Sequence, residues 1–213
     1  MRLFDYWRST SSYRLRIALA LKGIDVERSP VHLVRDGGEH RSLAYRALNP
    51  QGRVPSLQLD DGTVLTQSPA IIEYREERHP DPPLLPRDPV ARAKVRAVAA
   101  IVGCDMHPLH NVGPLTMLRR DVGRPEPEVE AWIARWIGEG LAAVEALIGD
   151  GPFCFGTEPG LADIYLVPQL YAAHRFHVPL DGLPRIAAAE RAALAHPAFA
   201  SAHPSRQPDA EPG

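Results

Sequence analysis

The architecture can be inferred from residues 2–33, which read RLFDYWRSTSSYRLRIALALKGIDVERSPVHL. Arg2–Tyr6 and Glu27–Leu33 are short strand candidates. Ser11–Lys22 between them is typical of a helix, and Gly23 is suited to end it. A strand, a helix and a second strand in this order predict a right-handed crossover between two parallel strands.

The following residues extend this unit. Two more strands are predicted at Ser56–Leu59 and Thr63–Thr66, because Asp60-Asp61-Gly62 between them is typical of a tight hairpin. One helical stretch ends at Leu48, and another begins near Ser68, which is suited to cap it. The resulting order, β-α-β-α-β-β-α, predicts a four-stranded mixed sheet with helices packed on it.

Five prolines between His79 and Pro89 mark a boundary, because a helix cannot propagate through such a run. We expect one domain over 1–80, a linker over 81–88 and an all-helical domain over 89–213. In that domain, valine and methionine side chains recur on one helix face and predict a buried stripe. The expected helices are Pro89–Asn111, Glu126–Ile148, Leu161–Phe176 and Leu183–Ala195, with a coil tail from His196, and the stripe is Val95, Val98, Val102 and Met106.

Composition narrows the classes of function. The 213 residues carry 24 basic and 26 acidic side chains, so the chain offers no broad basic surface for nucleic acid. The longest run without a polar side chain, Ala97–Cys104, has eight residues, whereas a membrane-spanning helix needs roughly 20. Two cysteines, Cys104 and Cys154, cannot build a disulfide framework. These features predict a cytoplasmic protein that binds neither nucleic acid nor membrane.

Four consecutive hydroxyl residues, Ser9–Ser12, lie between the first predicted strand and the first predicted helix. The free N–H groups and partial positive charge of a helix N-terminus favour an anion, and hydroxyl donors strengthen that preference. One interpretation is therefore a site for a thiolate or a carboxylate. The other is plain capping of the helix, for which a single Ser or Thr is enough.

Two further segments are candidates for ligand contacts. Pro55 stands directly before a predicted strand, and a cis bond after Val54 would leave the Val54 backbone free to pair with a peptide-like ligand. An ordinary trans proline is the alternative. Gln67 and Ser68 stand at another predicted helix N-terminus, which is suited to a carboxylate.

A polar cluster at the end of the helix predicted over Pro89–Asn111 is a fourth candidate. Cys104, His107 and Asn111 would share one face of a continuous helix, with His110 turned away from them. We predict no metal site, because this geometry fails and no fourth ligand is suitably spaced. The cluster is either a solvated helix end or part of the lining of a small-ligand cleft.

The order and content of these segments resemble a glutathione transferase, with a thioredoxin-like α/β domain followed by an all-α domain. The run Arg8-Ser9-x-Ser-Ser-x-Arg-x-Arg-Ile-Ala-Leu is similar to the zeta class in particular, the class of maleylacetoacetate and maleylpyruvate isomerases. The resemblance covers nearly the whole chain. It includes Ala47–Pro50, Gln67–Tyr74, Leu84–Pro86, Leu166–Gln169, Arg175-Phe176 and His203–Asp209.

The resemblance implies a glutathione site and assigns roles by position. Ser9 would hydrogen-bond the glutathione sulfur, with help from Thr10 and Ser11. Arg8 and Arg175 would face the carboxylates of a dicarboxylate substrate. The other implied glutathione contacts are His40 and Gln51 at the glycyl carboxylate, Val54 before cis Pro55 at the cysteinyl part, Gln67 and Ser68 at the γ-glutamyl carboxylate, and Asp105, His107 and Asn111, within one subunit or across a homodimer.

The chain departs from the zeta pattern at three positions. Ser11 stands where many zeta members have Cys, so no protein thiol acts there. Gly160 stands in a capping box where the family has Ser or Thr, and we expect a modest loss of stability from it. Maleylpyruvate-type members place an extra arginine near residues 111–114, whereas this chain has none there until Arg119.

The implied activity is glutathione-dependent cis–trans isomerisation of a maleyl diketo acid, in aromatic or tyrosine breakdown. A thiolate that adds to the maleyl double bond makes that bond single, and rotation and expulsion then give the fumaryl isomer. Lowering the thiol pKa by two units requires roughly 2.7 kcal/mol, within reach of one helix terminus plus hydroxyl donors.

The alternatives are a transferase that conjugates haloacids or other electrophiles and a non-catalytic interaction module. Two cationic anchors favour the isomerase, but the choice between maleylacetoacetate and maleylpyruvate stays open.

Overall fold

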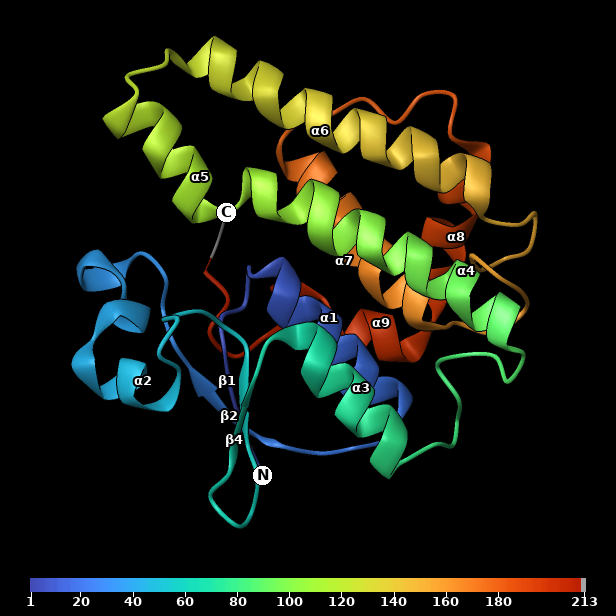
Figure 1. Ribbon diagram of the computed structural model, residues 1–213, viewed down its shortest axis with the longest axis horizontal. Helices are drawn as coiled ribbons and strands as arrows, with labels where there is room; N and C mark the ends of the chain where they lie inside the picture. The colour runs from blue at the N-terminus through green and yellow to red at the C-terminus, as the bar shows by residue number, and fades with distance from the viewer. Residues whose placement is uncertain (212–213) are drawn as a thin grey trace. The chain divides into compact units, whose positions relative to one another are not determined.

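The computed structural model describes residues 1–211, which divide into two compact units (Figure 1). One unit is Met1–Pro83 together with the segment that begins at His196, and the other is Leu84–Ala195. This division differs from the expected domains, 1–80 and 89–213, in its treatment of the C-terminal segment. The segment from His196 packs with the first unit because side chains of that unit bond its backbone and its polar groups.

The first unit is built on a four-stranded sheet in the order β2-β1-β3-β4. β1 (Arg2–Asp5) pairs in parallel with β2 (Glu27–Pro30) and antiparallel with β3 (Ser56–Gln58), which pairs antiparallel with β4 (Val64–Thr66). The predicted mixed sheet is therefore confirmed. The hairpin between β3 and β4 turns at Gly62, whose φ of 89° is readily adopted only by glycine.

Helices cover both faces of this sheet. α1 (Thr10–Leu21) and α3 (Ser68–Arg78) lie together on one face, and α2 (Leu43–Leu48) lies on the other (Figure 1). The predicted glycine end of α1 is confirmed, since Gly23 has a φ of 62° and the N–H of Ile24 reaches back to the carbonyl of Leu19 at 2.9 Å. The loop between β2 and α2 contains two 3-10 turns, η1 (Arg35–Gly37) and η2 (Glu39–Arg41).

The C-terminal segment is partly helical, so the expectation of a coil tail was wrong. It contains α9 (Pro197–Ala202) and a 3-10 turn, η6 (Pro204–Arg206). The helix begins at Pro197, which suits a first turn, and His196 caps it by accepting the N–H of Ala198 at 3.2 Å. α9 packs alongside α1 (Figure 1). Its Phe199 is fully buried.

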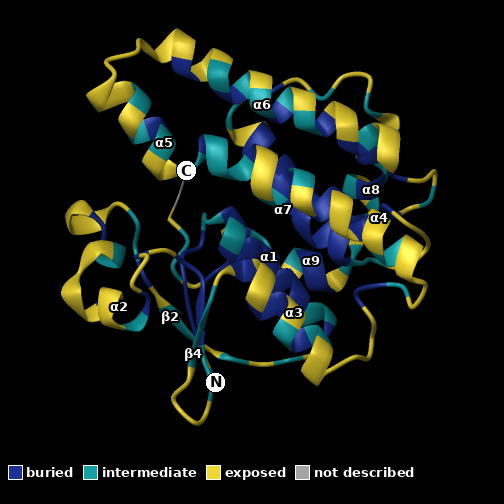
Figure 2. Ribbon diagram, viewed as in Figure 1, coloured by how far each residue is buried: buried dark blue, intermediate teal, exposed yellow. Residues whose placement is uncertain are grey.

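The regular structure in the described residues of the second unit is helical, as predicted for the chain after the prolines, apart from an isolated β-bridge between Phe153 and Gly156. Its helix α7 (Leu161–Arg175) is buried along most of its length (Figure 2). The predicted valine and methionine stripe is confirmed, because all four side chains are 3% exposed or less. No described helix in either unit is long and apolar enough to cross a membrane. The α-helices of this unit are α4 (Pro89–Ala100), α5 (Val112–Thr116), α6 (Glu126–Leu147), α7 (Leu161–Arg175) and α8 (Pro184–Ala195).

The helix predicted over Pro89–Asn111 does not continue to its expected end. After α4 the backbone changes to a π-helix, η3 (Ile101–Met106), and then to a 3-10 turn, η4 (His107–His110). The rings of His107 and His110 consequently lie edge to face, with centroids 5.5 Å apart. The prediction that His110 turns away from His107 was wrong, because side chains three residues apart come into line in a 3-10 turn. Neither α5 nor the π-helical η5 (Met117–Asp121) after it was predicted from the sequence.

Candidate functional site

Ser9 caps α1. Its hydroxyl oxygen accepts the backbone N–H of Ser12 at 3.2 Å, and the first turn of α1 carries no acidic side chain. A hydroxyl oxygen that accepts one hydrogen bond still has its own hydrogen to donate. Capping and anion binding by Ser9 are therefore compatible, and the positive end of the helix is not neutralised by a carboxylate in its first turn.

The neighbours of Ser9 differ in exposure. Ser11 and Arg8 are half-buried, whereas Thr10 is buried. The guanidinium of Arg8 lies 5.2 Å from the centre of the Trp7 ring, within the range of a cation–π contact. Arg8, Ser9 and Ser11 are thus the candidate side chains here with the most access to a ligand.

The peptide bond between Val54 and Pro55 is cis, which was one of the two possibilities. Within residues 1–211, neither the N–H nor the C=O of Val54 makes a backbone hydrogen bond. A backbone N–H and C=O without backbone partners can pair with an extended peptide, as they would with an added strand.

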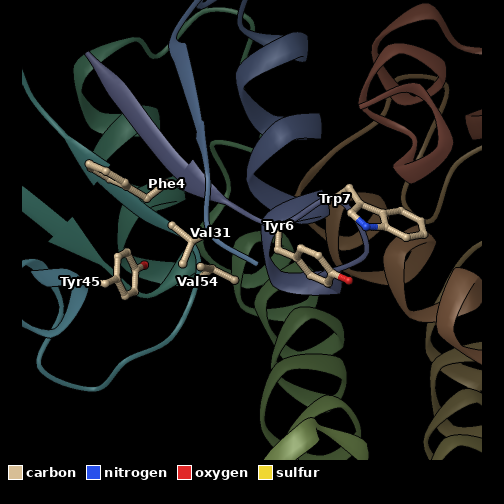
Figure 3. Close-up of a cluster of buried hydrophobic side chains, with 6 residues drawn as sticks. All are labelled: Phe4, Tyr6, Trp7, Val31, Tyr45 and Val54. Carbon is tan, nitrogen blue, oxygen red and sulfur yellow. The ribbon is translucent and has the colours of Figure 1, made fainter. Parts of the chain in front are cut away.

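Two side chains that were not among the predicted site residues hold the turn before Val54. Tyr45 Oη and Asn49 Nδ2 each donate to the carbonyl oxygen of Arg53 at 2.7 Å. The Asn49-Pro50 pair was part of the family resemblance, and that was the available signal for Asn49. The turn also joins a buried apolar cluster (Figure 3), which consists of Phe4, Tyr6, Trp7, Val31, Tyr45 and Val54.

The fold brings Gln51 and Gln67 together although they are sixteen residues apart. The side-chain amide of Gln67 donates to Oε1 of Gln51. Gln67 has a φ of 68°, a left-handed conformation that is uncommon for residues other than glycine. The predicted cap at Ser68 was wrong by one residue: Ser68 is the first residue of α3, and Gln67 occupies the N-cap position. The reason is that the bend into the helix occurs at the positive φ of Gln67.

His40 lies beside the turn that carries Gln51. A Cβ on Gly52 would come within 2.9 Å of the His40 carbonyl oxygen, so the two backbones are in close contact. Burial, and then the charge of Arg41, lower the pKa of His40, which keeps its imidazole neutral at pH 7. The neutral imidazole can contact a carboxylate by donating a hydrogen bond.

The remaining candidates lie in the second unit. Asp105 belongs to η3 and is exposed, His107 begins η4, and Asn111 caps α5 by accepting the N–H of Val112 at 2.8 Å. Because the helix changes type here, Cys104, His107 and Asn111 do not share the face that a continuous helix would give them. Arg175 is the exposed last residue of α7, and its guanidinium lies 4.5 Å from the centre of the Phe176 ring.

Gly160 leaves half of a capping box at the start of α7. Asp163 Oδ2 accepts the N–H of Gly160 at 2.9 Å, but glycine has no side chain to return the bond. The other oxygen of Asp163 accepts the N–H of Cys154, also at 2.9 Å. The carboxylate therefore still fixes the approach of the chain to α7.

Comparison with known proteins places both units in one family. The glutathione S-transferase N-terminal domain matches residues 8–78, and the glutathione S-transferase C-terminal domain matches residues 126–200. The maleylacetoacetate isomerase of Pseudomonas aeruginosa is 64% identical over 98% of both chains. The holo structure of a maleylpyruvate isomerase, described as a bacterial zeta-class glutathione S-transferase, superposes with a TM-score of 0.94 at 47% identity and covers 99% of this chain and all of its own. The chain belongs to the zeta-class glutathione transferases.

A second solved structure is also similar to this zeta-class glutathione transferase. It is the maleylacetoacetate isomerase of Anaeromyxobacter dehalogenans, with dicarboxyethyl glutathione and citrate bound in its active site. Its TM-score is 0.88 at 42% identity, over 99% of this chain and 94% of the other. The N-terminal family match begins at Arg8 and contains every candidate residue of the first unit. Arg175 lies inside the C-terminal match, whereas Asp105, His107 and Asn111 lie outside both matches.

Proposed function

We propose that this chain is a glutathione-dependent cis–trans isomerase of a maleyl diketo acid, either maleylacetoacetate or maleylpyruvate. The observation that carries the proposal is Ser9 at the N-terminus of α1, whose first turn carries no acidic side chain, in a chain similar over its full length to isomerases of this class. The higher identity to a maleylacetoacetate isomerase favours maleylacetoacetate.

The residues of the first unit fit a tripeptide thiol. The start of α1 with Ser9 suits a thiolate, and the unpaired backbone of Val54 before Pro55 suits a central peptide unit. The start of α3, with Gln67 and Ser68, suits the γ-glutamyl carboxylate. We assign the glycyl carboxylate to Gln51 and the neutral His40.

Bound glutathione supplies a thiolate that adds reversibly to the maleyl double bond, so that the bond can rotate before the thiolate leaves. Ser9 holds the sulfur by donating its hydroxyl hydrogen, while its oxygen keeps the cap bond to Ser12. The partial positive charge of α1 favours the anion, and Thr10 and Ser11 supply further donors at the same terminus. Together these groups lower the pKa of the bound thiol.

Arg8 and Arg175 are the proposed anchors for the substrate carboxylates. Each guanidinium lies over an aromatic ring, that of Trp7 or of Phe176, which orients its planar group while its charge is retained. Charge-assisted hydrogen bonds from arginine suit a dianion. The citrate and the dicarboxyethyl glutathione in the Anaeromyxobacter dehalogenans relative support a site for carboxylates.

Asp105, His107 and Asn111 are proposed as further glutathione contacts, within one subunit or across a homodimer. We also propose a cytoplasmic location and a role in aromatic or tyrosine breakdown. Family membership supports these assignments.

A spectrophotometric assay of maleylacetoacetate and maleylpyruvate, with and without glutathione, tests the function. We expect isomerisation only with glutathione, and free thiol that stays constant during turnover because the thiolate is released again. Stoichiometric loss of thiol would indicate a conjugating transferase. A protein that binds glutathione but turns over neither compound would contradict the proposal.

A further inference from the structure

Side chains from two distant parts of the first unit hold the backbone of Trp7. Its N–H donates to Asp209 Oδ2 at 3.0 Å, and its carbonyl oxygen accepts from Arg16 Nη2 at 2.8 Å. Ser9 follows two residues later, and its N–H donates to the carbonyl of Tyr6 at 3.0 Å. The loop that carries Arg8 and Ser9 is therefore held at both the backbone N–H and the backbone C=O of Trp7.

Arg16 is itself fixed in place. It is 4% exposed, its Nη1 lies 3.1 Å from Asp5 Oδ2, and its Nε donates to the carbonyl of Ala202 at 3.0 Å. Asp5 is fully buried and also forms an ion pair with Arg28. A guanidinium with this many fixed acceptors cannot rotate without breaking several hydrogen bonds.

Asp209 reaches the loop because the C-terminal segment is docked by Gln207. The side-chain oxygen of Gln207 accepts from Arg28 Nη1 at 2.7 Å, and its amide donates to the carbonyl of His203, also at 2.7 Å. The second carboxylate oxygen of Asp209, Oδ1, is buried with no hydrogen-bond partner among the described residues. Such an oxygen costs free energy, so the carboxylate is not explained by stability alone.

We propose that Asp209 and Arg16 are positioning residues for Ser9. By holding the N–H and the C=O of Trp7, they set where the Ser9 hydroxyl stands at the start of α1. They also orient the Trp7 ring on which Arg8 lies. The C-terminal segment is thus part of the thiolate site, an inference that rests on the proposed function.

Two variants of Asp209 and a matched control test this role. Asp209→Ala removes the acceptor for the Trp7 N–H, whereas Asp209→Asn keeps an acceptor oxygen of the same shape and removes the charge. The control is Glu211→Gln, because Glu211 lies on the same segment but contacts His32 and Arg35 instead of the loop. The readouts are the pKa of the glutathione thiol in the complex, from the ultraviolet absorbance of the thiolate, and kcat/KM as a function of pH.

The positioning role predicts different results for the two substitutions. Asp209→Ala should raise the thiol pKa by about half a unit or more and lower kcat/KM about tenfold, because a displaced donor no longer meets the sulfur. Asp209→Asn and Glu211→Gln should stay close to wild type. If Asp209 acted only through its charge, the thiol pKa would change in the opposite direction, because removing a negative charge lowers the thiol pKa. That decrease in pKa would be the same in Asp209→Ala and Asp209→Asn. An unshifted or lowered thiol pKa in Asp209→Ala would overturn the proposal.

Hydrogen exchange at the Trp7 and Ser9 amides of the ligand-free protein provides a readout that does not need glutathione. Exchange should be faster in Asp209→Ala than in wild type, and equal rates would contradict the proposal.

Should Asp209→Ala fail to fold, Arg16→Lys keeps the charge but loses the guanidinium fork, and it should also raise the thiol pKa. A wild-type protein that does not bind glutathione would contradict the proposed function and this role together, whereas normal binding with an unshifted pKa contradicts the role alone.

Discussion

Asp209 accepts a hydrogen bond from the backbone N–H of Trp7, although the two residues are 202 positions apart. The contact joins the C-terminal segment to the loop between the first strand and the first helix. Phe199 of the same segment is fully buried in the helix that packs along α1. The unit that carries Ser9 is therefore assembled from both ends of the chain.

Replacement of Ser9 should separate thiol activation from folding. Ser9→Ala removes the proposed donor to the sulfur and should reduce kcat about a hundredfold, as does loss of a donor aimed at a reacting anion. It also removes the cap bond to Ser12, which should cost about 1 kcal/mol of unfolding free energy and leave the protein folded. Steady-state kinetics and thermal unfolding measure the two effects. Unchanged turnover would assign thiol activation to Thr10 or Ser11.

Arg175→Ala should weaken substrate binding with little effect on glutathione. Loss of one charge-assisted hydrogen bond is worth about 1.5–3 kcal/mol, which corresponds to a rise in KM for the maleyl diacid of about tenfold or more. Arg191→Ala is a suitable control, because Arg191 is also an exposed arginine of the second unit. A loss confined to glutathione affinity would refute the assigned role of Arg175.

The two cysteines should differ in reactivity. Cys154 is fully buried, and burial, followed by the charge of Asp163, raises the pKa of its thiol. A raised thiol pKa keeps the proton on sulfur into the alkaline range, so Cys154 should resist alkylation at pH 8 while the exposed Cys104 reacts. Peptide mapping after iodoacetamide treatment should find one labelled cysteine in the folded protein and both after unfolding. A label on Cys154 in the folded protein would show that the thiol is accessible.

Two glycines of α6 should respond to alanine in opposite directions. A Cβ on Gly140 would come within 2.3 Å of the fully buried Met106, whereas a Cβ on Gly138 would meet nothing within 4 Å. Gly138→Ala should raise the unfolding free energy by about 0.5–1 kcal/mol through helix propensity. Gly140→Ala should lower it by about 1–3 kcal/mol, because Met106 has to move. Urea denaturation of both variants measures the difference, and equal effects would contradict close packing at Gly140.

Local sequence was sufficient for features that depend on near neighbours. The hairpin at Gly62, the end of α1 at Gly23 and the order of strands and helices along the first unit were all predicted, because turns and helix ends are set by a few adjacent residues. The resemblance carried by the run after Arg8 predicted the family, which the comparisons confirm.

The tertiary structure decided what depends on residues far apart in sequence. The sequence pattern did not show that the backbone after Ala100 changes from an α-helix to a π-helix, or that the His110 ring contacts the His107 ring. Nor did it show that Asp209 and Arg16 hold Trp7, since neither side chain has a local partner that would indicate this role. Propensities and caps act over a few residues, whereas these contacts form only when packing brings distant segments together. The sequence by itself therefore determined which groups stand at the start of α1, and the fold determined what holds them there.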